Sequence, residues 1–209
     1  MMRMNRREAP RYLIENAARW TASYVARRRA DPAYRFRWPE VSDGEVRLPL
    51  NRRLLRELLA ATAGHCAYCD GFPMGETSRE TIDHFRPKGD ERYHHLAFEW
   101  QNLFPACDRC QDEKSDEFDD RLLKPDELSY AFDSYFDFNA RTGELEPNRR
   151  ASVEDQERSW LTIATFGLNL PARCASRLRY FERCYRDAVR LSEDDMDSLP
   201  YRYLALAAP

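Results

Sequence analysis

Two Cys-x-x-Cys pairs constrain the fold of this 209-residue chain more than any other feature of its sequence. Cys66 pairs with Cys69 and Cys107 with Cys110, and 37 residues separate the two pairs. Four thiolates delivered in close pairs suit a tetrahedral Zn²⁺, which lies about 2.3 Å from each sulfur. One pair alone is also compatible with a redox site, but two pairs in one domain are most simply a structural zinc site. We therefore predict a closed zinc site that stabilises the fold, while the spacing alone leaves another thiophilic metal open.

The length and composition are typical of one globular domain or two small ones. Hydrophobic residues make up 43% of the chain and charged residues 33%, which lies in the usual range for a globular protein. No apolar run approaches the roughly 18 residues of a membrane span. The basic start of the chain leads into no apolar segment like that of a signal peptide. We expect a cytoplasmic protein with no membrane contact.

The formal net charge of −3 conceals an uneven distribution along the chain. Residues 1–60 hold 14 basic and 7 acidic side chains, a net +7. Residues 61–125 hold 8 and 14, a net −6, and residues 126–209 hold 11 and 15, a net −4. Basic surface attracts polyanions. The total charge disfavours a nucleic-acid ligand. The distribution of charge along the chain, however, allows a nucleic acid to bind the basic N-terminal region.

Apolar periodicity predicts helices before the first cysteine pair. A stripe of apolar side chains from Leu13 to Tyr24 predicts a helix over residues 10–30. An aromatic, proline-containing connection follows it. We then expect a second helix, with Asn51 as its N-cap and Gly64 placed to end it.

The C-terminal third predicts a hairpin followed by helices. Alternating aromatic residues around a turn indicate a β-hairpin over residues 135–146. Ser152, with Asp155 three residues later, resembles a capping box and opens one helix. Pro171 suits the first turn of another helix, whose apolar spacing continues to Val189.

Polar and charged residues stand in a fixed order around the cysteine pairs. They are Asp83-His84, Arg86-Pro87-Lys88, Trp100-Gln101-Asn102-Leu103 and, after the second pair, Lys114. Together with the cysteines, this series resembles the HNH endonuclease family, whose ββα-metal centre is buttressed by paired cysteines. The likeness covers about residues 64–116, a quarter of the chain. The fuller runs around the first pair and His84 resemble the HNH component of retron and Septu-type anti-phage defence systems.

The resemblance implies an α+β fold that is mostly helical. Its centre would be a zinc-buttressed ββα-metal core of the treble-clef-like HNH type, between helical flanks. We accordingly divide the chain into three regions. Residues 1–63 form an Arg-rich helical region, residues 64–124 the HNH nuclease core with its four-cysteine zinc site, and residues 125–209 a hairpin and helices that pack on the core.

Hydrolysis of a phosphodiester needs a base that activates water, a cation that stabilises developing charge, and positive groups that hold the phosphate. His84 is the predicted general base, because histidine ionises near neutral pH. Asp83 is the predicted carboxylate ligand of a catalytic Mg²⁺ or Mn²⁺ ion, since such ions prefer oxygen ligands. The resemblance adds Asn102, whose amide would orient the base or its loop. The simpler readings are a hydrogen-bonded core histidine, a turn aspartate and a capping asparagine.

The third hallmark position of the family, usually an Asn or His that ligates the catalytic ion, holds Gln111 in this chain. Glutamine keeps the amide oxygen but adds a methylene group, so the sequence leaves open whether activity is ordinary, weakened or altered in metal preference. Arg86, Lys88 and Lys114 are the predicted contacts to nucleic acid, with ordinary surface charge as the alternative. We expect loop or packing roles for the other histidines.

These observations predict a metal-dependent HNH nuclease with a structural Zn²⁺ and a catalytic Mg²⁺ or Mn²⁺. DNA is the favoured substrate, and a structured RNA such as tRNA is the second. The resemblance further implies an effector of anti-phage defence that works with an ABC/SMC-type ATPase partner. The alternative is a catalytically weak zinc module that docks a protein on an HNH scaffold. Gln111 and the acidic net charge favour this alternative, whereas Asp83, His84 and Asn102 together argue against it.

Overall fold

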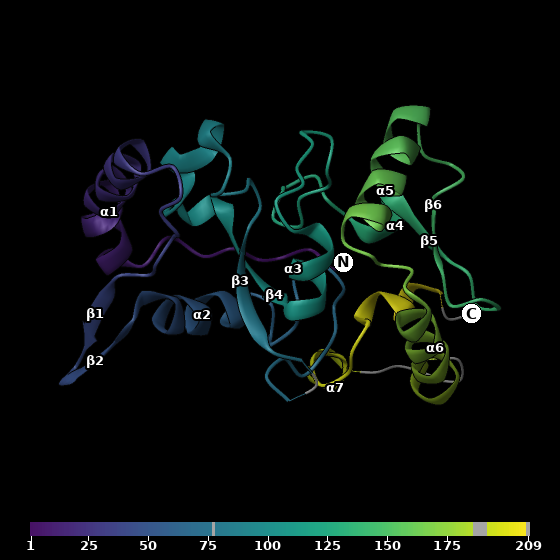
Figure 1. Ribbon diagram of the computed structural model, residues 1–209. Coiled ribbons are helices and arrows are strands. Elements are labelled where there is room, and N and C mark those ends of the chain that lie inside the picture. The colour runs from purple at the N-terminus through teal and green to yellow at the C-terminus, as the bar shows by residue number, and fades with distance from the viewer. Residues whose placement is uncertain (77, 186–191, 208–209) are drawn as a thin grey trace.

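The computed structural model describes residues 1–76, 78–185 and 192–207 (Figure 1). Over these residues the protein is a mixed α+β structure with more helix than strand and three separate two-stranded antiparallel sheets. The strands are β1 (Glu40–Asp43), β2 (Val46–Pro49), β3 (Glu80–His84), β4 (Leu103–Cys107), β5 (Phe136–Phe138) and β6 (Leu145–Pro147). The α-helices are α1 (Arg11–Ala30), α2 (Leu50–Ala60), α3 (Asp108–Lys114), α4 (Phe132–Tyr135), α5 (Val153–Thr165), α6 (Pro171–Tyr180) and α7 (Glu193–Asp197). Short 3₁₀ or π turns are η1 (Glu91–Leu96), η2 (Trp100–Asn102), η3 (Phe181–Tyr185) and η4 (Arg202–Ala207).

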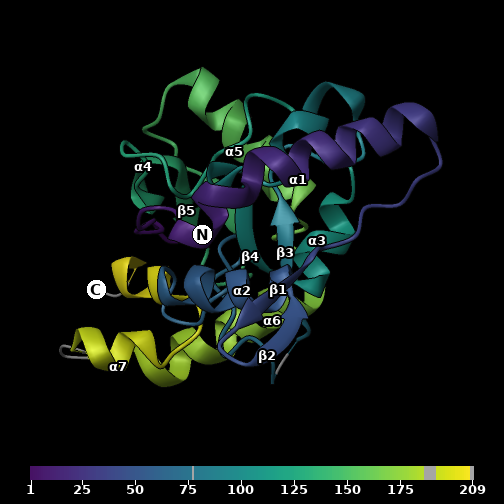
Figure 2. The ribbon, with the colours of Figure 1, turned by 90° about the vertical axis from the view of Figure 1, so that its left-hand side faces the viewer.

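Helix α1 forms one end of the molecule and confirms the first helix prediction (Figure 1). Leu13 and Tyr24 of the predicted stripe are buried, and Ala17 and Trp20 pack against the same core. Asp31 ends the helix in an extended conformation, because the following proline disfavours further helix. Figure 2, which looks onto this end, shows α1 running above the β1–β2 hairpin.

The aromatic connection contains a hairpin that the sequence reading missed. Strands β1 and β2 pair in register around Gly44, whose φ of +64° suits a tight turn. The prediction of Asn51 as an N-cap is wrong, because Pro49 occupies the cap position and the helix begins at Leu50. A proline at this point fixes a φ compatible with helix entry, so Asn51 already lies in the first turn. Gly64 ends the turn after α2 and donates its N–H to the Leu59 carbonyl at 2.9 Å.

The centre of the molecule is a compact ββα unit. Strands β3 and β4 pair antiparallel, so that His84 lies opposite Leu103 and Asp83 opposite Phe104. Helix α3 follows β4 without a loop and packs on both strands. The end of β3 is therefore next to the start of β4, and α3 lies beside them.

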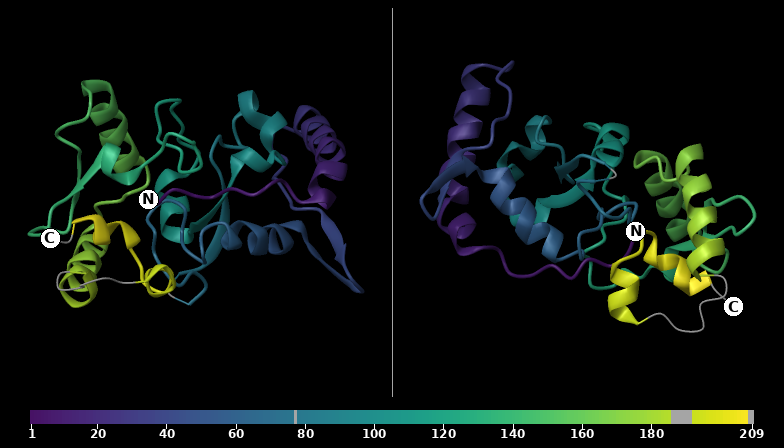
Figure 3. Two further views of the ribbon diagram at one scale, coloured as in Figure 1. Left: turned by 180° about the vertical axis from the view of Figure 1, so that it is seen from behind. Right: turned by 90° about the horizontal axis from the view of Figure 1, so that it is seen from below.

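The chain before α1 crosses the molecule and packs near its middle, as both views of Figure 3 show. Met4 donates its N–H to the Pro125 carbonyl at 2.8 Å. The Arg6 guanidinium pairs with Asp126 at 2.5 Å and donates to the carbonyls of Trp100 and Leu103. Arg6 thus links the N-terminal segment to two segments that are distant in sequence. The division into three regions stays a prediction.

The C-terminal third contains the expected elements. Strands β5 and β6 form the predicted hairpin. The Ser152 hydroxyl accepts the N–H of Asp155 at 3.1 Å and caps α5. Pro171 opens α6, which continues into the π turn η3, whereas Val189 lies outside the described residues. None of the helices that the structure describes is long and apolar enough to cross a membrane.

Candidate metal centre and active site

The four predicted zinc ligands converge on one buried point. The sulfur atoms of Cys66, Cys69, Cys107 and Cys110 all lie within 4.8 Å of one another. The Sγ atoms of Cys69 and Cys107 are 3.8 Å apart. A tetrahedral ion with bonds of about 2.3 Å would place its sulfurs about 3.8 Å apart. The cluster is therefore able to bind zinc.

Local backbone geometry explains why the four cysteines meet. The first pair lies in the turns after α2, and the second pair spans the junction of β4 and α3. The Cys107 N–H donates to Cys66 Sγ at 3.3 Å, and the Cys110 N–H donates to Cys107 Sγ at 3.5 Å. Burial raises the pKa of Cys66 and Cys110, whereas hydrogen bonds within the cluster lower the pKa of Cys69 and Cys107. A bound cation would allow all four thiols to ionise together.

A buried arginine from α6 contacts this cluster, and the sequence reading missed it. Arg173 Nη2 donates to the sulfurs of Cys110 at 3.1 Å and Cys107 at 3.7 Å. Its Nη1 donates to the carbonyls of Phe166 and Gly167 at 2.6 and 2.9 Å. Burial opposes the charge of Arg173, but the neighbouring thiolates outweigh burial and raise its pKa. The guanidinium thus offsets negative charge at the cysteines and ties α6 to them.

The C-terminal residues clamp the first cysteine pair. The Asp70 carboxylate, which is buried directly after Cys69, pairs with the Arg202 guanidinium at 2.7 Å. The Tyr203 hydroxyl donates to the Cys69 carbonyl at 3.4 Å. These contacts explain why a segment more than 130 residues away in sequence forms part of the same core as the cysteines.

A polar hollow of about 310 Å³ lies beside the ββα unit. It brings together four predicted site residues, two from β3, one from the following loop and one from α3. Its lining consists of Asp83, His84, Pro87, Lys88, Gln111, Asp112, Ser115 and Asp116. The hollow is therefore the candidate active site.

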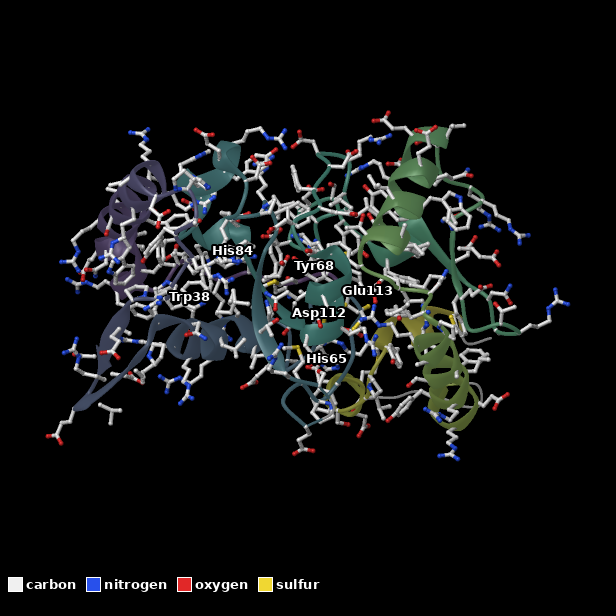
Figure 4. All side chains as sticks on the ribbon, in the orientation of Figure 1. Trp38, His65, Tyr68, His84, Asp112 and Glu113 are labelled. Carbon is white, nitrogen blue, oxygen red and sulfur yellow. The ribbon has the colours of Figure 1, made fainter. Side chains whose placement is uncertain are left out.

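His84 is buried and held in one orientation. Its Nε2 lies 2.9 Å from the Ala97 carbonyl, and because a carbonyl only accepts, Nε2 carries the proton and Nδ1 the free lone pair. Nδ1 has no hydrogen-bond partner among the described residues. The ring stacks on Trp38, with 5.5 Å between ring centres, and packs edge to face with Phe36 at 5.3 Å. Figure 4 labels His84 and Trp38 on the same side of the ββα unit. Burial, and then the positive charge of Lys88, hold the pKa of His84 well below its usual value.

Asp83 is enclosed by two partners that hold its carboxylate. The Tyr68 hydroxyl donates to Oδ2 at 2.7 Å, and Lys114 Nζ lies 3.4 Å from Oδ1. Burial and the Asp83 charge raise the pKa of Tyr68, which therefore keeps its proton and donates. Lys114 has no exposed side-chain surface and also donates to the His84 carbonyl at 2.9 Å. The burial and contacts of the ammonium favour a role in positioning Asp83 and the end of β3 over the predicted phosphate contact.

Asn102 fixes the loop that follows β3. Its Oδ1 accepts the Arg86 N–H at 2.7 Å, and its Nδ2 donates to the Arg86 and Leu96 carbonyls at 3.0 and 3.2 Å. The Arg86 side chain points to a different part of the surface, where it pairs with Asp120 at 3.2 Å and lies over Phe118. Asn102 therefore holds the backbone of the loop that follows His84, and Arg86 does not line the hollow.

Gln111 and Lys88 both line the hollow. Gln111 Nε2 donates to the Ile82 carbonyl at 3.3 Å, which leaves its amide oxygen as the group suited to a metal ion. Burial lowers the pKa of Lys88, and the charges of Asp83 and Asp116 partly oppose this shift. Lys88 is thus the predicted phosphate contact that the structure places beside His84.

The remaining histidines have packing or surface positions. His65 is fully buried, bonds the Leu199 carbonyl through Nε2 at 3.0 Å and stacks on Phe72. His94 is buried against Tyr24, whereas His95 is exposed on the 3₁₀ turn η1. The expected packing role is confirmed for His65 and His94.

The donors in the hollow differ chemically from those of the cysteine site. Asp83, Asp112 and Asp116 supply carboxylates, and Gln111 supplies an amide oxygen. Within the described residues, the cysteine cluster is the one group of three or more Cys, His, Asp or Glu side chains close enough to share an ion. Mg²⁺ needs only one or two carboxylates and keeps several waters. The oxygen donors of the hollow fit a hard divalent ion of this kind.

Comparison with known proteins gives one partial similarity. No family model matches the chain. The chain is 35% identical over 57 residues to the Septu protein PtuB of Bacillus thuringiensis. The matched stretch is 27% of this chain and 21% of that protein, so the chain spans about a fifth of the length of the relative. The similarity supports a relationship to Septu proteins over that stretch.

Proposed function

We propose that this protein is a metal-dependent nuclease of the HNH type that hydrolyses phosphodiester bonds. The observation that carries the proposal is the state of His84. One ring nitrogen is anchored to a backbone carbonyl, the other is buried without a hydrogen-bond partner among the described residues, and the residue lines an acidic, metal-suited hollow. A neutral, oriented imidazole is the form that a general base requires.

The residues of the hollow take complementary roles in this proposal. Asp83 and Gln111 would hold Mg²⁺ or Mn²⁺, and the bound ion would stabilise the charge that develops on the phosphate. His84 accepts a proton from the attacking water. Asn102 positions the His84 loop through the Arg86 backbone. Lys88 binds the phosphate, while Lys114 acts as a positioning residue for Asp83.

The biological setting is proposed from the resemblance and the partial similarity to PtuB. The protein would act as the nuclease of an anti-phage defence system, with an ABC/SMC-type ATPase of the PtuA kind as its partner. DNA is the favoured substrate, and RNA such as tRNA is the second. The zinc site would stabilise the core without taking part in the reaction.

The test is a cleavage assay with the purified 209-residue chain. Plasmid DNA and total tRNA are incubated separately with Mg²⁺ or Mn²⁺, with and without a PtuA-type ATPase as the proposed partner, and an EDTA arm serves as control. We expect metal-dependent cleavage of at least one substrate. His95→Ala is a matched control, because His95 is exposed and lies outside the hollow. The absence of metal-dependent cleavage in every arm would refute the proposal.

A non-catalytic zinc module that docks a protein is the second candidate. The observation in its favour is that both carboxylate oxygens of Asp83 already have protein partners, Tyr68 and Lys114. A carboxylate has additional lone pairs for a metal, so this observation weakens the nuclease proposal without removing it. Stable binding of the ATPase, combined with no cleavage by the complex, would favour the docking module.

A further inference from the structure

The segment of residues 34–38 alternates aromatic and basic side chains beside the candidate active site. Its sequence is Tyr34-Arg35-Phe36-Arg37-Trp38. The three aromatic residues are half-buried, whereas both arginines are exposed. Successive side chains of an extended chain point to opposite sides. The segment therefore packs its rings inward and presents Arg35 and Arg37 to solvent.

The inward rings place this segment against His84. Phe36 meets the His84 ring edge-on at 5.3 Å, and Trp38 stacks on it at 5.5 Å. Lys88 Nζ lies 5.5 Å from the centre of the Phe36 ring. The two exposed arginines are thus each one residue away from a ring that contacts the candidate base. No described residue forms a salt bridge with Arg35 or Arg37.

The end of α1 anchors the segment in this position. The Tyr24 hydroxyl donates to the Lys88 carbonyl at 2.7 Å. Arg28 donates to the Tyr34 carbonyl at 3.1 Å and to the Gly89 carbonyl at 3.4 Å. Figure 2 shows the chain leaving the far end of α1 and descending toward β1. These bonds tie the backbone at the start of the segment, and the loop that follows His84, to the same helix.

A small hollow beside the segment combines aromatic rings with positive charge. Its volume is about 210 Å³, and its lining includes Trp20, Tyr34, Trp38 and two arginines, Arg27 and Arg37. Aromatic rings beside a positively charged surface are the combination that proteins use to bind nucleic-acid strands, through phosphate contacts and base stacking. The acidic residues of the active-site hollow supply no such attraction.

We infer that residues 34–38 form the binding track for the sugar–phosphate backbone of the nucleic-acid strand that enters the active site. Arg35 and Arg37 contact phosphates next to the one presented to His84. This inference rests on the proposed nuclease function and adds a substrate-binding site outside the HNH-like motif. It would also allow a chain of net charge −3 to attract a polyanion, since the two arginines lie on the segment whose rings contact His84.

The test measures binding separately from cleavage. The wild-type protein and the Arg35→Ala/Arg37→Ala variant are titrated into fluorescein-labelled 30-nucleotide single strands of DNA and RNA, without added Mg²⁺ or Mn²⁺. Fluorescence anisotropy gives Kd between 50 and 200 mM NaCl. The matched control is Arg141→Ala/Arg150→Ala, which removes two exposed arginines from the β5–β6 end of the molecule. Zinc content and circular dichroism verify that each variant is folded.

Removing one arginine–phosphate interaction should reduce the slope of log K against log salt by about 0.7, and weaken binding about 5-fold at 0.1 M salt. We therefore expect the double variant to bind about 25-fold more weakly, with a slope smaller by about 1.4. DNA and RNA should show the same weakening, since backbone contacts read no base. The control variant should match the wild type.

Two outcomes would overturn the inference. An unchanged Kd and salt slope in the Arg35→Ala/Arg37→Ala variant would remove the track while leaving the nuclease proposal intact, provided that the wild type cleaves. An equal weakening in the Arg141→Ala/Arg150→Ala control would show that only total charge matters. If the wild type neither binds nor cleaves nucleic acid, both this inference and the proposed function fail.

Discussion

Replacing Lys114 by Met distinguishes a buried structural lysine from a phosphate-binding one. The ammonium has no exposed surface, lies 3.4 Å from Asp83 Oδ1 and donates to the His84 carbonyl at 2.9 Å. Met fills a similar volume but leaves the Asp83 carboxylate buried with only Tyr68 as a partner. Removing one member of a buried ion pair costs about 3–5 kcal/mol, because the other charge stays buried.

We expect the Lys114→Met variant to lose about 3–5 kcal/mol of unfolding free energy. At about 2–4 °C per kcal/mol for a chain of this size, Tm should fall by roughly 6–20 °C. Urea denaturation of the zinc-loaded protein, followed by circular dichroism, measures the loss. Arg109→Met is the matched control on the same helix, because Arg109 is exposed, and its effect should stay within about 0.5 kcal/mol.

A second substitution tests the physical cause. Asp83→Asn removes the buried negative charge and still accepts the Tyr68 hydrogen bond, so it should restore part of the stability lost in Lys114→Met. The double-mutant cycle then gives a coupling free energy of about 0.5–3 kcal/mol between the two positions. A Lys114→Met variant that is as stable as the wild type but binds nucleic acid more weakly would refute the buried pairing and favour the phosphate contact.

Three further substitutions or conditions test other parts of the structure. Arg173→Met should release zinc to a chelator faster than the control Arg179→Met does, because the Arg173 guanidinium donates to the cysteine sulfurs and Arg179 lies on the exposed side of the same helix. Equal rates of zinc release would count against a role of Arg173 at the cysteines. Gln111→Asn should retain or increase cleavage, since it keeps the amide oxygen at the proposed ligand position; a large loss of both metal affinity and activity would argue against the assignment. Cleavage should persist as pH falls from 8 through 6.5, because burial holds the pKa of His84 well below its usual value and keeps the ring neutral; an activity midpoint above 6.5 would contradict this.

Local patterns predicted the elements whose signals are complete within a short stretch. The Cys-x-x-Cys spacing predicted the cysteine cluster, and apolar periodicity predicted α1. The resemblance grouped Asp83, His84 and Gln111 as one site, and the three residues line the same hollow. The β1–β2 hairpin carried a recognisable Asp43-Gly44 turn signal, which the sequence reading overlooked among aromatic residues and prolines.

Contacts between distant segments could not be predicted in the same way. Arg173 reaches Cys110 across 63 residues, and no motif marks it among 30 arginines. The burial of Lys114 follows from the packing of Tyr68, Asp83 and α3 around it, which its own sequence neighbours do not reveal. Tertiary packing therefore determines which basic side chains are buried in structural contacts and which lie exposed at the surface, where a ligand can reach them.

The most direct test of the proposed nuclease is the cleavage rate of His84→Ala under conditions where the wild type is active. Initial rates are measured with Mg²⁺ or Mn²⁺ on the same substrate, and zinc is quantified in both proteins. We predict one zinc per chain in each protein, and a rate at least 10²-fold lower in the variant, which is the usual contribution of a general base. An undiminished metal-dependent rate in the zinc-loaded His84→Ala variant would contradict the proposed role of His84.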